Sequence, residues 1–286
     1  MDYLIITDSG CDISPKTLKS WGVQCIDLSF RKADSPRDCY NRDIVMTEFY
    51  DEMRAGTVFQ TSAVNTAEYT DVFSKALQQG LNVLYICFSS GLSACRNSAD
   101  LAAAELASEY PKNKVAVIDS LCGSAGLGLL VYLAVQKKKG GADFSSLIKY
   151  IEETIPRISH WFTVDDLKYL KRGGRVSPSA AFAATVLDIK PILHVDDEGH
   201  LVPVTKVRGR RAAIKALAEK YQLLAEDPEA PYFISHGDCL EDALLLESMI
   251  HAKSKNKAAS ITDIGPVVGS HAGPGTLALF FAGRER

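Results

Sequence analysis

Residues 83–100 have the sequence VLYICFSSGLSACRNSAD. The segment 83–88 is a continuous apolar run, which predicts a β-strand buried on both faces. A Ser/Gly turn follows it, and an Ala-rich segment then predicts a helix that extends to about Tyr110. A buried strand that passes through a turn into a helix is the repeating unit of a parallel α/β sheet.

The same alternation surrounds this unit. Strands are predicted at 3–7 and 115–118, with a further apolar stretch at 23–30. Ser14 and Pro15 predict the start of a helix, as a cap and a first-turn proline. Further helices are predicted from Thr66 to Gly80, over 125–136, and from the cap Asp143 to Pro156. The β-α-β-α order predicts a parallel sheet with helices on both faces.

The second half has a different pattern. Residues 190–195 and 200–207 flank an Asp-Asp-Glu-Gly turn and predict a hairpin. Helices are predicted over 211–224 and 240–253, and strands near 232–235, 259–263 and 276–281. We therefore predict an α/β protein with an N-terminal Rossmann-like parallel-sheet domain, residues 1–158. A C-terminal α+β domain with a mainly antiparallel sheet is predicted over residues 159–286.

Composition excludes several classes of protein. The 286 residues fit two domains at about 150 residues each. With 32 Lys and Arg against 35 Asp and Glu, no dominant basic face is expected, which argues against nucleic-acid binding. Neither a signal peptide nor an apolar run of about 20 residues is evident. Seven scattered cysteines without a C-x-x-C pair predict reduced thiols in a cytoplasmic protein, not disulfides or a zinc site.

Hydroxyl side chains occupy the turns where a parallel sheet binds ligands, beyond the carboxyl ends of its strands. Ser89, Ser90 and Ser93 follow the buried strand, and Thr61 and Ser62 precede the next predicted helix. These hydroxyls could hold one small anion. Ser and Thr are also ordinary helix caps, and the residues by themselves leave both interpretations open.

His271 lies in GSHAGPGT, residues 269–276, between two glycines. This pattern predicts a tight loop whose backbone comes close to another group, although a polar surface loop is the simpler alternative. No His or Cys partner stands at ligand spacing, so no metal site is predicted. Ser93 could act as a nucleophile only with a base and its orienting partner, and no G-x-S-x-G elbow is present.

Two basic segments complete the candidates. LKYLKRGGRVS, residues 167–177, predicts a short helix that buries Leu167 and Leu170 and ends at two glycines. Arg175 follows those glycines and could pair with a carboxylate or a phosphate. KVRGRR, residues 206–211, is either a solvated face or a patch that docks a partner. The glycines near residue 125 do not follow the dinucleotide-binding order, and no P-loop is present.

Taken together, these segments resemble the DegV family of bacterial fatty-acid-binding proteins. The resemblance covers nearly the whole chain, and the order and spacing of its motifs are far more specific than any one motif. It is carried by ITDS (6–9), TS (61–62), SSGLS (89–93), IDS (118–120), LKYLKRGGRVS (167–177), KPILHVDDEG (190–199), VTKVRGRR (204–211) and GSHAGPGTLAL (269–279).

The resemblance implies a long-chain fatty acid between two domains, with its tail in an enclosed apolar tunnel and no cofactor or metal. It further implies a protein that does not catalyse alone. Such a protein is the carrier subunit of a fatty acid kinase, and it presents the carboxylate to an ATP-dependent partner for acyl phosphate formation in phospholipid synthesis. Transient contact with a membrane is compatible with this role. By motif position, the resemblance assigns Thr61, Ser62, Ser93 and His271 to the carboxylate site. It places Arg175 near the head group or the phosphate, and Arg208 on the face that docks the kinase.

The chain departs from the family pattern beside the expected carboxylate site. Ala94 and Cys95 stand where the family usually has Gly-Thr, and Ala63 and Val64 follow the TS pair where a proline is usual. These changes bear on ligand preference. A stand-alone acyl hydrolase or transferase that uses Ser93 and His271 remains the alternative function, and a regulatory protein that binds through residues 206–211 is a third.

Overall fold

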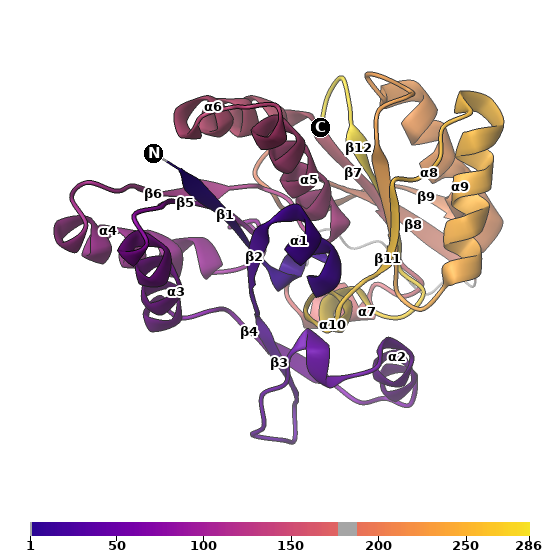
Figure 1. Ribbon diagram of the computed structural model, residues 1–286. Helices are drawn as coiled ribbons and strands as arrows, with labels where there is room; N and C mark the ends of the chain where they lie inside the picture. Colours follow the sequence, from indigo (N-terminus) through magenta and orange to yellow (C-terminus); the bar gives the residue numbers. More distant parts are fainter. Residues whose placement is uncertain (1, 177–187) are drawn as a thin grey trace.

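The computed structural model describes residues 2–176 and 188–286, so Ser177, the last residue of LKYLKRGGRVS, lies outside the described residues. The described chain forms a parallel sheet and a mostly antiparallel sheet, each with its own helices (Figure 1). This arrangement confirms the predicted α/β fold class.

The parallel sheet has the order β2-β1-β5-β6. Its strand β5 alternates between two cores: Val83 and Tyr85 pack on one face, Leu84 and Ile86 on the other. Burial on both faces explains the continuous apolar run from which the strand was predicted. The strands are β1 (Tyr3–Asp8), β2 (Val23–Ile26), β5 (Asn82–Cys87) and β6 (Val115–Asp119).

Helices cover both faces of this sheet, as predicted (Figure 1). Ser14 accepts a hydrogen bond from the Thr17 amide at 3.1 Å and caps the first helix, as its sequence indicates. The helix predicted to begin near Thr66 is capped one residue earlier, by Asn65 in a capping box with Glu68. One face carries α3 (Thr66–Gln78) and α4 (Cys95–Glu109), and the other carries α1 (Pro15–Trp21), α5 (Ala125–Lys139) and α6 (Phe144–Thr154).

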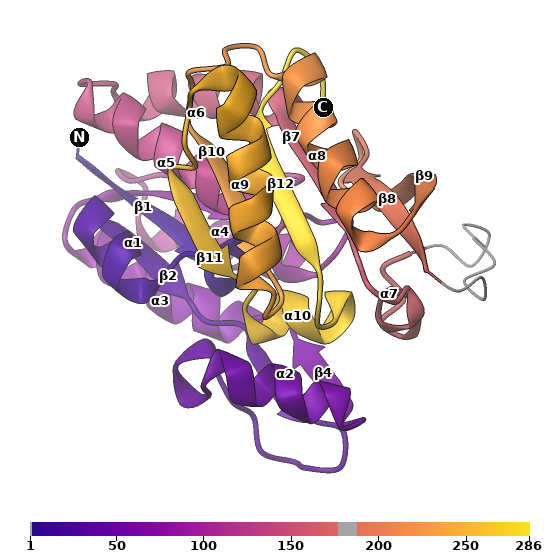
Figure 2. The same cartoon turned by 90° about the vertical axis from the view of Figure 1, so that its right-hand side faces the viewer.

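The second sheet has the order β11-β10-β12-β7-β8-β9, with only the β10–β11 pair parallel. Its outer face is covered by α8 (Arg210–Leu224) and α9 (Leu240–Ser254) (Figure 2). Strand β7 was not predicted from the sequence. It begins at about residue 158, where we propose the domain boundary. The strands are β7 (Ile158–Thr163), β8 (Ile189–Val195), β9 (Leu201–Arg208), β10 (Tyr232–His236), β11 (Ser260–Asp263) and β12 (Leu277–Ala282).

Helix α5 lies between the two sheets and contacts strands of both. It is buried on nearly every side, which explains why its sequence is apolar all round. Two glycines allow the close approach. A Cβ at Gly126 would collide with His160 of the second sheet, and a Cβ at Gly128 would meet Ile13 of the first half. The halves therefore share one hydrophobic core through α5.

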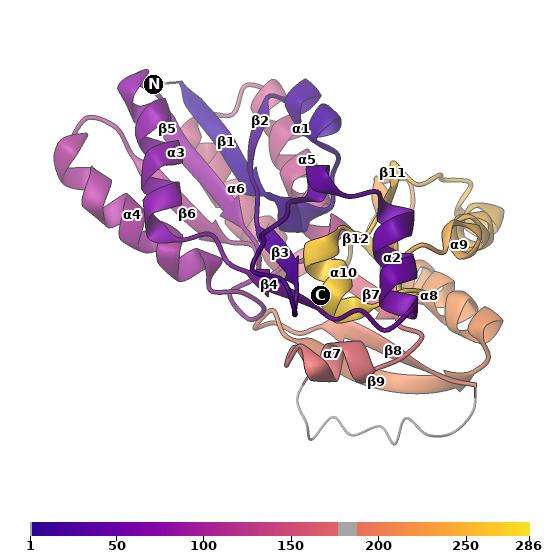
Figure 3. The same cartoon turned by 90° about the horizontal axis from the view of Figure 1, so that it is seen from below.

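A small antiparallel pair of strands, β3 and β4, and three short helices close one end of the molecule (Figure 3). The apolar stretch 23–30 is divided between two sheets, since it enters β2 of the parallel sheet and then β3 of this two-stranded sheet. His271 lies in the last turn of a helix, so the predicted loop is wrong at that residue. The elements are β3 (Ser29–Lys32), β4 (Phe59–Ser62), α2 (Met46–Arg54), α7 (Lys168–Arg172) and α10 (Pro266–Ala272), with 3-10 turns η1 (Ser9–Cys11), η2 (Asn41–Asp43) and η3 (Ile155–Arg157).

Candidate functional site

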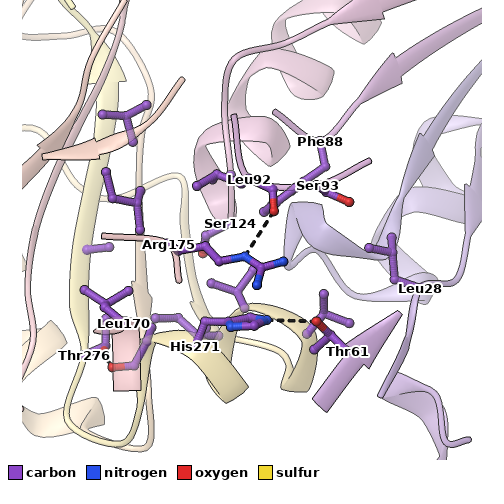
Figure 4. Close-up of a pocket in the computed structure, with 18 of the residues that line it drawn as sticks. Leu28, Thr61, Phe88, Leu92, Ser93, Ser124, Leu170, Arg175, His271 and Thr276 are labelled. Carbon is purple, nitrogen blue, oxygen red and sulfur yellow. Dashed lines mark hydrogen bonds between the residues drawn. The ribbon is translucent and has the colours of Figure 1, made fainter. Parts of the chain in front are cut away.

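Five predicted site residues line one cavity, which we call the inner cavity. Thr61 and Ser62 come from the end of β4, Ser93 from the turn after β5, Arg175 from the segment after α7, and His271 from α10 (Figure 4). The inner cavity has a volume of about 230 Å³, far above the roughly 10–15 Å³ that one buried water needs. Residues from both halves of the chain therefore meet around one space.

Thr61 and His271 are joined by a hydrogen bond of 2.8 Å between Oγ1 and Nε2 (Figure 4). Burial, followed by the nearby charges of Arg175 and Arg172, lowers the pKa of His271 to about 4. The imidazole is therefore neutral near pH 7. Gly173 packs against its Nδ1 so closely that a side chain there would collide with the ring.

Ser93 lies just before α4 and lines the inner cavity. Its hydroxyl accepts a hydrogen bond from the Cys95 amide at 3.3 Å and donates to the Cys95 sulfur at 3.2 Å. Because sulfur is a weak acceptor, the hydroxyl hydrogen can be redirected to a stronger acceptor at low cost. Ser89 has a different role, since its hydroxyl donates to the Gly199 carbonyl at 2.9 Å and ties the halves together.

The alternative function, a hydrolase, needs Ser93 and His271 to interact. In the structure, each has another partner: Ser93 bonds to Cys95 and His271 bonds to Thr61. A nucleophile and its base lie within hydrogen-bond reach of each other. The geometry therefore gives the hydrolase hypothesis no support.

Arg175 brings a positive charge to the same end of the inner cavity. It follows Gly174, whose positive φ of 69° reverses the chain after α7. Its Nε donates to the Leu92 carbonyl at 3.3 Å and its Nη1 donates to the Gly173 carbonyl. Burial lowers the pKa of Arg175, and no carboxylate contributes to that shift. The guanidinium has five N–H donors, and contacts with the described residues leave several of them for an anionic ligand.

The rest of the inner cavity is mostly apolar, with Ser124, His160 and Thr276 as its further polar residues. The polar residues Ser124 and Thr276 also line it, but their hydroxyls are bonded to protein groups, to Asp12 at 2.6 Å and to Ala272 at 2.9 Å respectively. His160 is buried against Phe280, and burial lowers its pKa to about 3. The apolar lining comprises Leu28, Phe88, Leu92, Phe162, Leu170, Val195, Leu201, Ile264, Val267, Val268, Ala278 and Phe280.

Arg208 does not line the inner cavity. It is exposed at the end of β9, an edge strand of the second sheet. The neighbouring Arg210 is held by Asp242 at 2.8 Å, so its charge is already paired within the protein. Ser124 and His160 were not predicted from the sequence as lining residues, and Arg172 was not singled out. No short-range signal marks these residues, because packing between the halves brings them to the cavity.

The described part of the chain shows neither a group of metal-ligating side chains nor a membrane-spanning helix. Across residues 2–176 and 188–286, no three His, Cys, Asp or Glu side chains are grouped so that they could hold a metal ion. No helix in these ranges has both the length and the apolar character needed to cross a bilayer. All seven cysteines are free thiols.

The fold and the inner cavity define an α/β binding protein for an amphipathic ligand, with an apolar space that ends at hydroxyl, imidazole and guanidinium groups. The chain belongs to the DegV family, since the family profile described as "Uncharacterised protein, DegV family" matches residues 3–284. A DegV domain-containing protein of Clostridium perfringens is 38% identical over 284 residues, which cover 98% of this chain and 97% of the relative. A DegV domain-containing protein of Streptococcus pyogenes is 31% identical over 286 residues, which cover 100% of this chain and 99% of the relative.

Solved structures of similar proteins share the fold over the full length. A DegV lipid binding protein from Thermotoga maritima has a TM-score of 0.84 at 27% identity, with complete coverage of both chains (100% each). A fatty-acid-binding DegV family protein from Thermus thermophilus has a TM-score of 0.87 at 26% identity, and the match covers 98% of this chain and 99% of that protein. A stearic-acid-binding protein from Eubacterium ventriosum has a TM-score of 0.87 at 25% identity, covering 98% of each chain.

Proposed function

We propose that this protein binds a long-chain fatty acid in the inner cavity, with the carboxylate at Thr61, Ser93 and His271. The observation that carries the proposal is the cavity itself, which is largely apolar. The polar side chains that line it and still have hydrogen-bond donors for a ligand lie together at one end. The fatty-acid-binding relatives with the same fold support it. Ser62 and Arg175 line the same end and belong to the proposed head-group site.

The physical terms fit such a ligand. Each buried methylene contributes about 0.8 kcal/mol, so the apolar lining can provide most of the affinity. The head group needs only a few fixed donors. When His271 carries its hydrogen on Nε2, it donates to Thr61, and the Thr61 hydroxyl hydrogen is then available to a carboxylate oxygen. Arg175 adds charge complementarity.

The proposal extends to a carrier role in a fatty acid kinase system, in which this protein is not itself the catalyst. A carboxylate oxygen of the bound fatty acid would attack the terminal phosphorus of ATP held by the kinase subunit. A new O–P bond forms, the bond from that phosphorus to the β-γ bridging oxygen breaks, and ADP leaves. The exposed Arg208 belongs to the proposed docking face for the kinase.

The test begins with mass spectrometry of lipid extracted from the natively purified protein. We expect a long-chain fatty acid, and a protein that carries none and also binds none on titration contradicts the proposal.

The Ser93→Ala variant tests the head-group assignment. It should weaken fatty acid binding by roughly 1–3 kcal/mol, because the carboxylate loses a donor. Ser90→Ala is the matched control, since Ser90 lies in the same turn, is exposed and does not line the inner cavity. Dissociation constants measured by titration should separate the two variants, and equal affinities would remove Ser93 from the site.

A further inference from the structure

A second cavity, which we call the outer cavity, adjoins the head-group end of the inner cavity. It has a volume of about 330 Å³ and shares Thr61, Arg175 and His271 with the inner cavity. These three residues therefore stand between the two spaces. The exposed side chains of Gln60 and Arg172 also line the outer cavity, together with Val58, Phe59, Gly173 and Ser270.

The outer cavity is positively charged, and the described residues that line it include no carboxylate. Arg172 and Arg175 both line it, and both lie close enough to His271 to contribute to the lowering of its pKa. Arg175 is partly buried with only backbone carbonyls as hydrogen-bond partners among the described residues. A desolvated cation without a counter-charge is costly, so an anionic ligand would be favoured here.

Arg172 differs from Lys168 and Lys190, two other cations near α7. Lys168 pairs with Asp166 at 3.0 Å, and Lys190 pairs with Asp165 at 2.8 Å. Within residues 2–176 and 188–286, Arg172 makes no ion pair, and its guanidinium packs over the Tyr169 ring, 5.3 Å from the centroid. Its charge is therefore available to a ligand.

We propose that the outer cavity binds the phosphoryl group of an acyl phosphate, and that Arg172 is a residue that holds it. This inference rests on the proposed function. With the acyl carbonyl at Thr61 and His271, the phosphorus lies one bridging oxygen beyond it, and the outer cavity is the space that opens on the far side of this pair. A guanidinium can bind two phosphate oxygens at once, which suits a dianion better than a carboxylate already held by Thr61.

The test compares two ligands of equal acyl chain: a fatty acid, and a 2-oxoalkylphosphonate in which CH₂ replaces the bridging oxygen of the acyl phosphate. Dissociation constants are measured for the wild type, Arg172→Gln and Lys171→Gln. Lys171 is the matched control, because it is an exposed cation on the same helix that does not line the outer cavity. Arg172→Gln should weaken phosphonate binding by about tenfold or more, with little change for the fatty acid. Lys171→Gln should change neither.

Several results would overturn the assignment. These are equal losses for both ligands in Arg172→Gln, no loss for either, or the same loss in Lys171→Gln. Inorganic phosphate is titrated separately into fatty-acid-loaded protein, and Arg172-dependent binding as tight as that of the phosphonate would show a free-anion site instead. A wild type that binds no fatty acid overturns the proposed function itself, whereas fatty acid binding with Arg172-independent phosphonate binding overturns only the outer-cavity assignment.

Discussion

Asp12 is a residue whose chemistry depends on both halves of the chain. Its carboxyl accepts hydrogen bonds from the Ser124 hydroxyl at 2.6 Å and from the Gly265 amide at 2.9 Å. Burial, with smaller contributions from Asp263 and Asp8, raises the pKa of Asp12 to about 8. The folded protein therefore holds this carboxyl in its neutral form at pH 7, immediately behind a wall of the inner cavity.

This raised pKa predicts a pH-dependent stability. Between the unfolded pKa of 3.8 and the folded pKa of about 8, the folded state binds more protons at Asp12 than the unfolded state does. The contribution of Asp12 to the free energy of unfolding is therefore full below pH 4 and decreases as the pH rises to about 8. Asp12→Asn keeps the shape of the neutral carboxyl and, since Asp12 has a φ of 51°, suits the left-handed backbone.

Chemical denaturation of the wild type and of Asp12→Asn at pH 6 and pH 8 checks this prediction. The wild type should lose more stability than the variant over that interval. Asp8, whose pKa of about 6 lies at the lower end of this interval, is present in both proteins, so the difference between them reports Asp12. The same loss in both proteins would contradict the raised pKa.

At the scale of elements, the position of His271 depends on how α10 ends. Gly273 caps this helix with a φ of 86°, and a Cβ there would collide with the Tyr169 ring on α7. The Gly-rich sequence around His271 was interpreted as a tight loop with close backbone contacts. The close contacts are present, but they belong to a packed helix end.

Gly273→Ala should therefore lower both stability and fatty acid affinity. Left-handed strain costs about 1–2 kcal/mol, and the clash with the rigid ring adds about 1–3 kcal/mol. Gly80→Ala is the control: Gly80 has a similar φ of 76° but open space around its Cα. The Gly80→Ala variant should therefore lose only the stability that the backbone strain costs, and its affinity for the fatty acid should be unchanged. Denaturation curves and fatty acid titration measure both effects, and equal behaviour of the two variants would exclude the packing role.

At the scale of the whole molecule, the residue proposed for kinase docking, Arg208, is not among those that line the inner cavity. The head-group end of the inner cavity lies beside α7, α10 and the β3–β4 pair of strands, whereas Arg208 is at the edge of the second sheet. Lipid binding and kinase docking should therefore be separable by substitution. An exposed charge at the rim of an interface influences association more than it influences the buried ligand.

We expect Arg208→Ala to retain its fatty acid and to lose efficient coupling to the kinase. The KM of the kinase for the loaded carrier should rise by roughly fivefold, equivalent to about 1 kcal/mol, with kcat unchanged. Lys149→Ala, which alters an exposed cation on α6, should match the wild type. Lipid content by mass spectrometry and acyl phosphate formation give the two readouts. Loss of lipid together with coupling would argue against a docking role.

Local sequence signals determined much of this protein. The buried β5 run, the Ser14 cap and the glycine stop after α7 act within a few residues, so they can be recognised without the fold. The motif order identified the family and, with it, the residues expected at the head group. Ser93 and Thr61 were candidates on local grounds as well, since Ser93 follows a buried strand and Thr61 precedes a predicted helix.

The tertiary structure decided what those residues meet. Thr61 and His271 are 210 positions apart in the chain, and only the packing of α10 against β4 places their side chains 2.8 Å from each other. Likewise, Arg172 is an ordinary helix-end cation in the sequence. It lines a charged cavity only because α7, α10 and β4 converge. Hydrogen bonds within a turn depend on neighbouring residues, whereas burial, shifted pKa values and cavities depend on surfaces that meet after folding.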